Sequence, residues 1–200
     1  MSAENYTVVG DAPTNTIISL QDAKDFCRID NTADDSLIQV LIDTVIMSCE
    51  KITNRVLREA TYLGQFSRLE YSNFERYPYV DIHRSPVSSV TSVQIWDGTA
   101  YTDEPNLFQN VDGYPRILFN EYGHSVPRGV AFNDDVAYPL QITFTAGYGD
   151  GQVPPQLINA MKAHILFLYE NRGDVPPDGN IPIPIESNML YRQFRVVGMF

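Results

Sequence analysis

The sequence predicts an α+β protein. In it, two N-terminal helices and one long C-terminal helix form a small bundle, with an inserted antiparallel β domain and an extended C-terminal tail. Residues 17–59 and 153–173 repeat apolar side chains at three- and four-residue steps, as amphipathic helices do. Residues 60–145 instead alternate apolar and polar side chains between turn residues, which indicates strands. A block of strands between helices favours α+β over alternating βαβ units.

The composition predicts a folded protein made in the cytosol. Two hundred residues, 44% of them apolar, suffice for one domain with a core or for two small ones. The net charge of −11 disfavours binding to nucleic acid, which requires clustered cations. Cys27 and Cys49 lack metal or redox spacing and are interpreted as buried thiols. No apolar run approaches the length of a membrane span, so we expect no membrane partner.

Two capping signals predict the N-terminal helices. Residues 1–16 lack periodicity and are interpreted as an N-terminal arm, either disordered or ordered on a neighbour. Ser19 with Asp22 has the spacing of a capping box and opens a short helix. Thr32 with Asp35 repeats that spacing and opens a longer helix. The apolar stripe of the longer helix comprises Leu37, Ile38, Leu41, Ile42, Val45, Ile46, Cys49 and Ile52.

The acids that open the longer helix do not form a calcium loop. Asp30, Thr32 and Asp34 have the right spacing. The sixth position, which needs glycine, is Asp35, and the twelfth, which needs glutamate, is Leu41. We therefore expect no metal here.

The β part is predicted to hold strands at residues 61–66, 80–83, 90–96, 107–108, 116–119 and 141–145. Asp97–Gly98 is a strong hairpin signal. Residues 120–139 contain Gly and Pro and predict a long surface loop, with room for an edge strand at 130–132.

A stiff elbow joins the last strand to the long helix. Gly147 and Gly149 indicate a turn, and Pro154 and Pro155 suit the start of a helix. A phosphate-binding loop is the weaker interpretation, because Asp150 would repel an anion and the prolines lack N–H donors.

Residues 174–200 predict an extended, proline-rich C-terminal arm, in which residues 185–191 can add one or two helical turns. The arm is apolar to its last residue. It either docks on a partner or packs on its own core, and the sequence leaves both open.

We expect no catalytic residue and no cofactor. The histidines are His83, His124 and His164, and none lies in a motif of known mechanism. An alternative function is an aromatic-lined carbohydrate- or protein-binding module that uses Tyr71, Tyr77, Tyr79 and Trp96.

A series of short segments resembles the tailed-bacteriophage head–tail connector (adaptor) family. They occur in the order expected for that family and span most of the chain. The segments are Ile18-Ser-Leu-Gln-Asp, Asp34-Asp-Ser-Leu-Ile, Thr53-Asn-Arg-Val-Leu, Arg84-Ser-Pro-Val, Gly147-Tyr-Gly, Tyr169-Glu-Asn-Arg and Leu190-Tyr-Arg. The N-terminal arm, the 120–138 loop and the apolar tail after Arg192 depart from the family's pattern.

The resemblance implies a structural virion protein that is made in the cytoplasm of the host bacterium. Its copies would form a ring, commonly of twelve, under the portal of the DNA-filled capsid. Its partners would be the portal protein, a downstream head-completion, stopper or tail protein, and itself. Genomic DNA would pass through the channel without specific binding.

Two sets of site residues follow from the elbow, the tail and the resemblance. The predicted portal-docking residues are Tyr191, Arg192, Phe194, Val196, Val197, Met199 and Phe200. The predicted ring-contact and elbow residues are Gly147, Tyr148, Gly149, Pro154, Tyr169 and Arg172.

Overall fold

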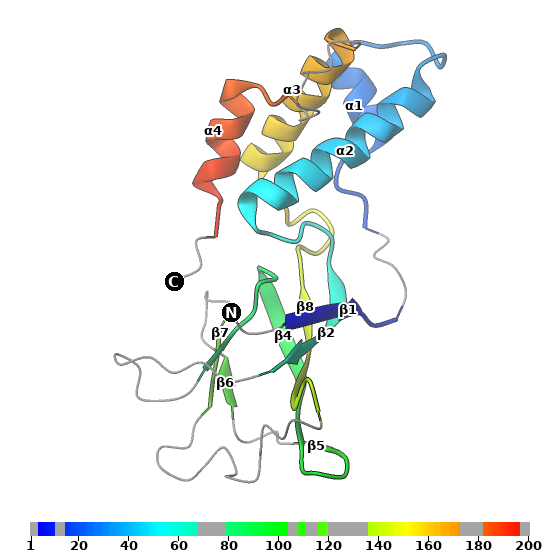
Figure 1. Ribbon diagram of the computed structural model, residues 1–200. Coiled ribbons are helices and arrows are strands. Elements are labelled where there is room, and N and C mark those ends of the chain that lie inside the picture. Colours follow the sequence, from blue (N-terminus) through cyan, green and yellow to red (C-terminus); the bar gives the residue numbers. More distant parts are fainter. Residues whose placement is uncertain are drawn as a thin grey trace. The chain divides into compact units, whose positions relative to one another are not determined.

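The computed structural model divides the chain into two compact units (Figure 1). The β unit comprises Met1–Pro13 and Glu59–Gly147, and the helical unit comprises Thr14–Arg58 and Tyr148–Met199. The structure describes residues 4–10, 15–67, 79–103, 108–110, 116–119, 136–172 and 182–196. These residues form helices and antiparallel sheets, so the predicted α+β class is confirmed at that level.

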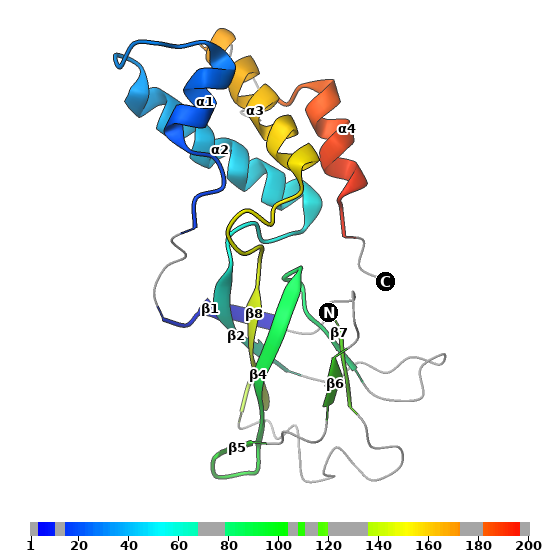
Figure 2. The same ribbon diagram turned by 180° about the vertical axis from the view of Figure 1, so that it is seen from behind.

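Two antiparallel sheets make up the described part of the β unit (Figure 2). The larger sheet has the order β1 (Glu4–Val8), β2 (Ala60–Phe66), β8 (Leu140–Ala146), β4 (Val87–Trp96) and β5 (Tyr101–Asp103). The smaller has the order β3 (Tyr79–Asp81), β7 (Arg116–Phe119) and β6 (Phe108–Asn110). Each predicted strand outside the 120–135 segment overlaps one of these. Most of the predicted 120–139 loop lies outside the described residues.

The strand β8 forms the centre of the β-unit core. Its side chains are buried at every second position, from Leu140 to Ala146, as the pleat of a half-buried strand requires. Phe66 of β2 and Val93 of β4 pack on the same side, and Val80 of the smaller sheet joins them. The alternation of apolar and polar residues in the sequence of this strand therefore matches its alternation of buried and half-buried side chains.

The Asp97–Gly98 hairpin signal is confirmed. The amide of Asp97 donates to the carbonyl of Ala100 at 3.0 Å, and Gly98 has a φ of +107°, a conformation that favours glycine. The carboxylate of Asp97 accepts hydrogen bonds from the amides of Thr99 and Ala100. These bonds hold the pKa of the Asp97 carboxyl below its usual value.

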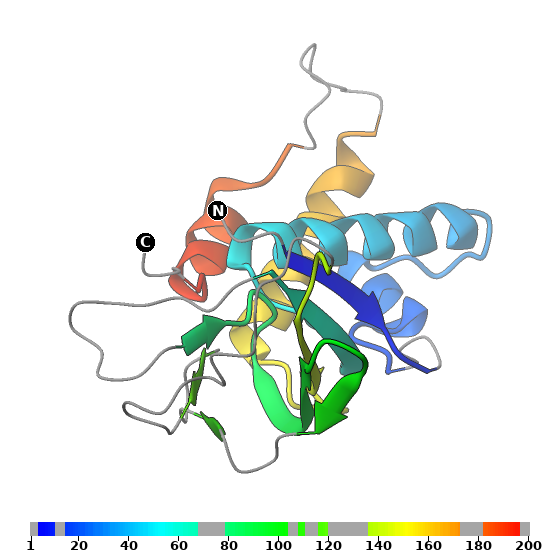
Figure 3. The same ribbon diagram turned by 60° about the horizontal axis from the view of Figure 1, so that its bottom comes forward.

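The N-terminal arm predicted for residues 1–16 is wrong where the structure describes it. Residues Glu4–Val8 form β1, which pairs antiparallel with β2 at the edge of the larger sheet (Figure 3). The ring of Tyr6 packs edge-on against Phe66 and Phe144, at centroid distances of 5.9 and 6.2 Å. Residues Glu4–Val8 are therefore ordered by pairing with the edge of β2 and by the packing of Tyr6. Neither interaction produces a periodic pattern in the sequence, so the sequence did not predict this strand.

The helical unit is built from α1 (Leu20–Cys27), α2 (Asp35–Thr53), α3 (Pro155–Glu170) and α4 (Ile185–Gln193). All four contribute to one hydrophobic cluster. Its fully buried side chains include Ile38, Ile42, Leu57, Leu157, Met161, Ile165 and Tyr191. The long helix is thus packed on the N-terminal pair, and Pro155 occupies its first turn as predicted.

One of the two predicted capping boxes is present. Ser19 accepts a hydrogen bond from the amide of Asp22 at 3.0 Å, which confirms the start of α1. The box predicted for Thr32 and Asp35 is wrong, because the N-cap of α2 is Asp34 and its side chain makes no capping bond. The carboxylates of Asp34 and Asp35 instead bind side chains of α3 and α1.

The C-terminal segment also differs from the predicted extended arm. Residues Ile185–Gln193 form α4, a helix of nine residues that begins after Pro184. No proline interrupts this stretch, and its inner face buries Ser187 and Tyr191. Burial of that face stabilises a helix where the sequence predicts at most two turns.

Substitution of Gly64 by alanine tests the close packing of the β unit. An added Cβ would lie 2.9 Å from Cε2 of Phe66 and 3.1 Å from Phe144, and both rings are buried. We expect Gly64→Ala to reduce the free energy of unfolding by about 1–3 kcal/mol, measured by urea denaturation. Ser89→Ala, at an exposed position of β4, is the control and should change it by about 0.5 kcal/mol or less. Equal effects of the two substitutions would contradict this account.

Candidate functional site

The predicted docking residue Tyr191 is part of the core of the helical unit. Its side chain is fully buried, and its hydroxyl lies 3.4 Å from Nδ1 of His164 on α3. Nε2 of His164 lies 3.1 Å from the carbonyl of Pro182. Because that carbonyl can only accept, Nε2 carries the proton and Nδ1 accepts from Tyr191. Ser187 adds a hydrogen bond from its hydroxyl to the carbonyl of Ala160, at 2.9 Å.

This buried network fixes α4 on α3. Burial of the Tyr191 hydroxyl raises the pKa of that group. Desolvation by burial lowers the pKa of His164, so its imidazole is held in the neutral form. Tyr191 therefore serves to anchor the helix rather than to face a partner.

The residues that follow α4 are held at the end of α2. Nε of Arg55 donates to the carbonyl of Phe194 at 2.7 Å, and the amide of Val196 donates to the carbonyl of Thr53 at 2.8 Å. Phe194 also packs against the helical core. Among the other predicted docking residues, Arg192 is exposed, and Val197, Met199 and Phe200 lie outside the described residues.

The elbow between β8 and α3 is closed by bonds inside the chain. Gly147 has a φ of +114°, and the chain here favours glycine. The amide of Tyr148 donates to the carbonyl of Leu57, while its own carbonyl accepts from the side chain of Asn15. The amide of Gln152 donates to the carbonyl of Gly149, and the carbonyl of Pro154 accepts from the first turn of α3.

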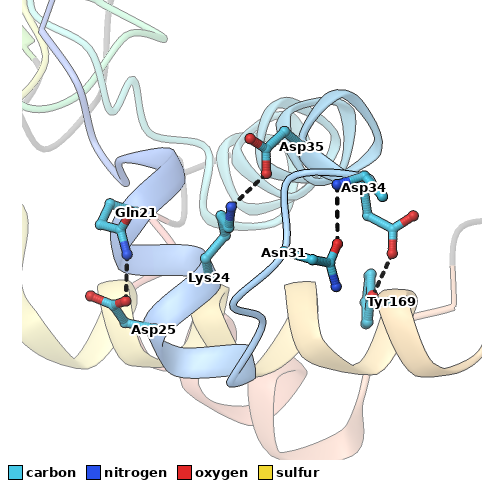
Figure 4. Close-up of polar contacts among 8 residues, drawn as sticks. Gln21, Lys24, Asp25, Asn31, Asp34, Asp35 and Tyr169 are labelled. Carbon is cyan, nitrogen blue, oxygen red and sulfur yellow. Dashed lines mark hydrogen bonds and ion pairs between the residues drawn. The ribbon is translucent and has the colours of Figure 1, made fainter.

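Tyr169 and Arg172, predicted to contact a neighbouring subunit, both bind Asp34 of the same chain. The hydroxyl of Tyr169 donates to Oδ2 of Asp34 at 2.7 Å (Figure 4). Nη1 of Arg172 lies 3.3 Å from the same oxygen. The guanidinium also lies over the Tyr169 ring, 4.4 Å from its centroid. The bond from Tyr169 is the largest single effect that holds the pKa of the Asp34 carboxyl below its usual value, and the hydrogen bond and charge of Arg172 lower it further.

A second ion pair joins the N-terminal helices. Nζ of Lys24 on α1 lies 2.7 Å from Oδ1 of Asp35 at the start of α2, and Lys24 is buried (Figure 4). Together the carboxylates of Asp34 and Asp35 connect α1 and α3 to the first turn of α2.

The predicted site residues are not brought together in one place. Several of them make contacts inside the chain that stabilise its fold.

The described residues provide no cluster of side chains for a metal ion. In this part of the chain, no group of three or more His, Cys, Asp or Glu side chains could hold a metal ion. Burial raises the pKa of the Cys49 thiol to about 12, which makes it a poor nucleophile. None of the described helices is long and apolar enough to cross a membrane.

The aromatic residues proposed for carbohydrate binding are only partly described. Trp96 is half-buried and packs edge-on against Tyr101, with ring centroids 5.2 Å apart. Tyr79 is half-buried in β3, while Tyr71 and Tyr77 lie outside the described residues. The alternative therefore gains no specific support.

Two outward helix faces carry apolar residues that the sequence-based site prediction omits. Val40 and Met47 of α2 are 61% and 69% exposed, and Ile185 and Met189 of α4 are 75% and 62% exposed. The sequence does hold a signal for α2, because Val40 and Met47 lie off its predicted apolar stripe.

Acidification tests the buried state of His164. An unfolded histidine protonates near pH 6.5, whereas the folded pKa of His164 is lowered, so the unfolded state binds more protons between those two values. We expect the free energy of unfolding to fall as the pH drops below about 6.5, by up to about 1.4 kcal/mol per pH unit from this residue. His164→Gln should lack that contribution, and His83→Gln, at an exposed position, should follow the unsubstituted chain. Parallel curves for His164→Gln and the unsubstituted chain would refute this assignment.

Titration by NMR tests the contact between Tyr169 and Asp34. In Tyr169→Phe the carboxylate loses its strongest donor, so the pKa of Asp34 should rise toward its ordinary value. Arg172→Gln should also raise the pKa of Asp34, because the hydrogen bond and the charge of the guanidinium both lower it. An unchanged Asp34 pKa in Tyr169→Phe would show that the bond is not formed in solution.

Comparison with known families confirms the resemblance seen in the sequence. Residues 17–93 match the family described as phage gp6-like head-tail connector protein. That family consists of structural connector proteins and not of enzymes, so the expectation that this chain is not an enzyme is confirmed. No curated protein matches the chain.

Solved structures of particle necks share the fold. One, described as the neck of an empty GTA particle computed with C6 symmetry, has a TM-score of 0.68 and 20% identity over 98% of this chain and 97% of that chain. Another, the neck of a native GTA particle computed with C12 symmetry, has a TM-score of 0.67 and 19% identity with the same coverage. A virion of the native gene transfer agent gives the same values as the second. At this identity the likeness establishes the fold.

Proposed function

We propose that this chain is a head–tail adaptor, a structural virion protein whose copies close into a ring under the portal. The ring joins the DNA-filled capsid to the tail. The observation that carries the proposal is the match of residues 17–93 to the connector family. The fold shared with a neck structure computed with C12 symmetry supports a ring of twelve.

Ring formation requires each copy to present two different faces that fit each other. The bonds made by Tyr148, Tyr169 and Arg172 inside one chain support a role in holding the shape of the subunit. Gly147, Gly149 and Pro154 set the elbow that the ring would repeat in every copy. On this proposal the elbow residues hold the shape of each copy and do not themselves touch the neighbouring copy.

The acidic charge suits a channel through which DNA moves. With a net charge of −11 per copy, a ring would repel phosphates and limit adhesion of the genome. The other partners of the adaptor are the portal protein above and a head-completion, stopper or tail protein below. Synthesis takes place in the cytoplasm of the host.

The end of the chain is the proposed portal-docking segment. Tyr191 and Ser187 hold α4 on the helical unit, and Phe194 and Val196 are held by α2. Val197, Met199 and Phe200 follow this fixed point and supply apolar side chains for a groove on the portal.

Electron microscopy of the chain mixed with purified portal protein tests the function. An added ring below the portal supports the proposal, and a monomer in the absence of portal is compatible with it. Portal rings that stay bare at saturating concentrations of the folded chain would refute it.

Serine substitution of the last apolar residues tests the docking segment. We expect the triple variant Val197→Ser, Met199→Ser and Phe200→Ser to keep its circular dichroism spectrum and to bind portal at least about tenfold more weakly, since burial of three apolar side chains is lost. Binding is measured by pull-down over a concentration series. Phe26→Ser, at an exposed apolar position of α1, is the control. Unchanged binding of the triple variant would remove the docking assignment.

A further inference from the structure

We infer that Arg55 is a positioning residue for portal docking, because it helps to clamp the residues that follow α4. The inference rests on the proposed function, in which the docking segment, residues 197–200, binds the portal protein. It goes further by naming the residues that fix where this segment begins. They lie at the end of α2, at positions 53–55, and are called the C-terminal clamp below.

Each clamp residue makes a hydrogen bond to the backbone just after α4. Nε of Arg55 donates to the carbonyl of Phe194 at 2.7 Å. The amide of Val196 donates to the carbonyl of Thr53 at 2.8 Å. The side chain of Asn54 donates to the carbonyl of Val196 at 3.2 Å. Three bonds thus hold a short segment that belongs to neither a helix nor a strand.

A left-handed turn at the end of α2 shapes the clamp. Asn54 has a φ of +52°, a conformation that asparagine adopts more readily than most residues. The helix therefore ends at Thr53, whose carbonyl has no partner within α2. Because Thr53 is fully buried, a bond from the protein has to replace one from water. The amide of Val196 provides that bond.

Arg55 also joins the clamp to Tyr148 of the elbow. Its side chain is half-buried, and Nη1 donates to the hydroxyl of Tyr148 at 3.1 Å. A guanidinium carries its donors in a rigid plane, so it holds two partners in fixed directions. The amide of Tyr148 in turn donates to the carbonyl of Leu57. The carbonyl of Phe194 is therefore fixed relative to both α2 and Tyr148.

Termination of α4 does not by itself account for the clamp. The C-cap of α4 is Phe194, whose amide already donates to the carbonyl of Tyr191. Val196 lies three residues beyond Gln193, the last residue of the helix, yet its amide and its carbonyl are both bonded. The last residues of a chain are ordinarily ordered only where contacts tie them down. The bonds to Val196 therefore set the direction in which the chain continues.

A fixed start favours binding of the docking segment. A segment that binds a partner loses conformational freedom, and this loss opposes binding. When the preceding residues are already held, less freedom remains to be lost. In a ring, every copy would start its docking segment from the same position, so all copies can reach equivalent grooves of the portal together.

Binding of clamp variants to purified portal protein tests the inference. Arg55→Met removes the donors and keeps a side chain of similar length. We expect it to keep its circular dichroism spectrum and to bind about tenfold more weakly in a pull-down over a concentration series. Arg55→Lys should lose less, because it keeps the charge but not the fork of donors. Arg58→Met is the matched control and should bind normally, since Arg58 pairs with Asp43 instead.

Combination with the docking variant separates positioning from direct contact. In the triple variant Val197→Ser, Met199→Ser and Phe200→Ser, correct placement of the segment no longer matters. Adding Arg55→Met to it should therefore weaken binding further by less than about twofold. A further loss of about tenfold would show that Arg55 acts independently of the segment, and it would overturn the inference.

Amide hydrogen exchange, followed by NMR on the free chain, reports on the clamp itself. The amide of Val196 should exchange at least about tenfold faster in Arg55→Met than in the unsubstituted chain. Tyr148→Phe removes one partner of the guanidinium and keeps the ring, so it should raise this rate less and weaken portal binding about threefold. That variant decides the matter if Arg55→Met does not fold. Unchanged exchange in the folded variants would overturn the inference.

The proposed function and the clamp fail in different ways. Absence of portal binding by the unsubstituted chain would refute the function, and the inference with it. Normal binding by Arg55→Met together with fast exchange at Val196 would leave the function intact and overturn only the positioning role. Tighter binding by Arg55→Met would show that the clamp holds the segment back, which also overturns that role.

Discussion

One buried face of α3 organises the helical unit. Leu157, Ala160, Met161 and Ile165 supply its apolar surface, and His164 lies among them without exposure to solvent. Helices α1, α2 and α4 all pack on α3, so three segments distant in the sequence share one core. Because His164 is buried, it must be satisfied by hydrogen bonds, and its two ring nitrogens do this with Pro182 and Tyr191. The position of α4 follows from that requirement.

The same constraint decides which residues can meet a partner. A side chain used to fill the core or to satisfy a buried group is not available outside, as Tyr191 shows. Tyr169 and Arg172 are similarly engaged by Asp34. The outer sides of α2 and α4 stay exposed, and apolar residues lie between charged ones there.

Local signals in the sequence predicted a helix start or a turn correctly where that feature depends only on neighbouring residues. The Ser19–Asp22 box, the Asp97–Gly98 turn and the Pro155 helix start are confirmed because each depends on a few neighbouring residues. Strand β1 and helix α4 depend on partners more than 50 and 25 residues away, respectively, such as Gln65 for Asn5 and His164 for Tyr191. The Thr32–Asp35 box failed for the same reason, since distant side chains bind both acids. Periodicity likewise identified the buried stripe of α2. It left Val40 and Met47 off that stripe, and both side chains are exposed on the other side of the helix.

The register between β2 and β8 has a consequence for how this fold can vary. Ala60, where the chain enters the inserted β segment, is paired directly with Ala146, where it leaves. Entry and exit are therefore adjacent strands of one sheet, a few ångströms apart. The loops between those two strands can therefore lengthen or shorten without changing the distance between the points where the chain enters and leaves the β segment. Related proteins can in this way differ in the β segment while they keep a common helical frame.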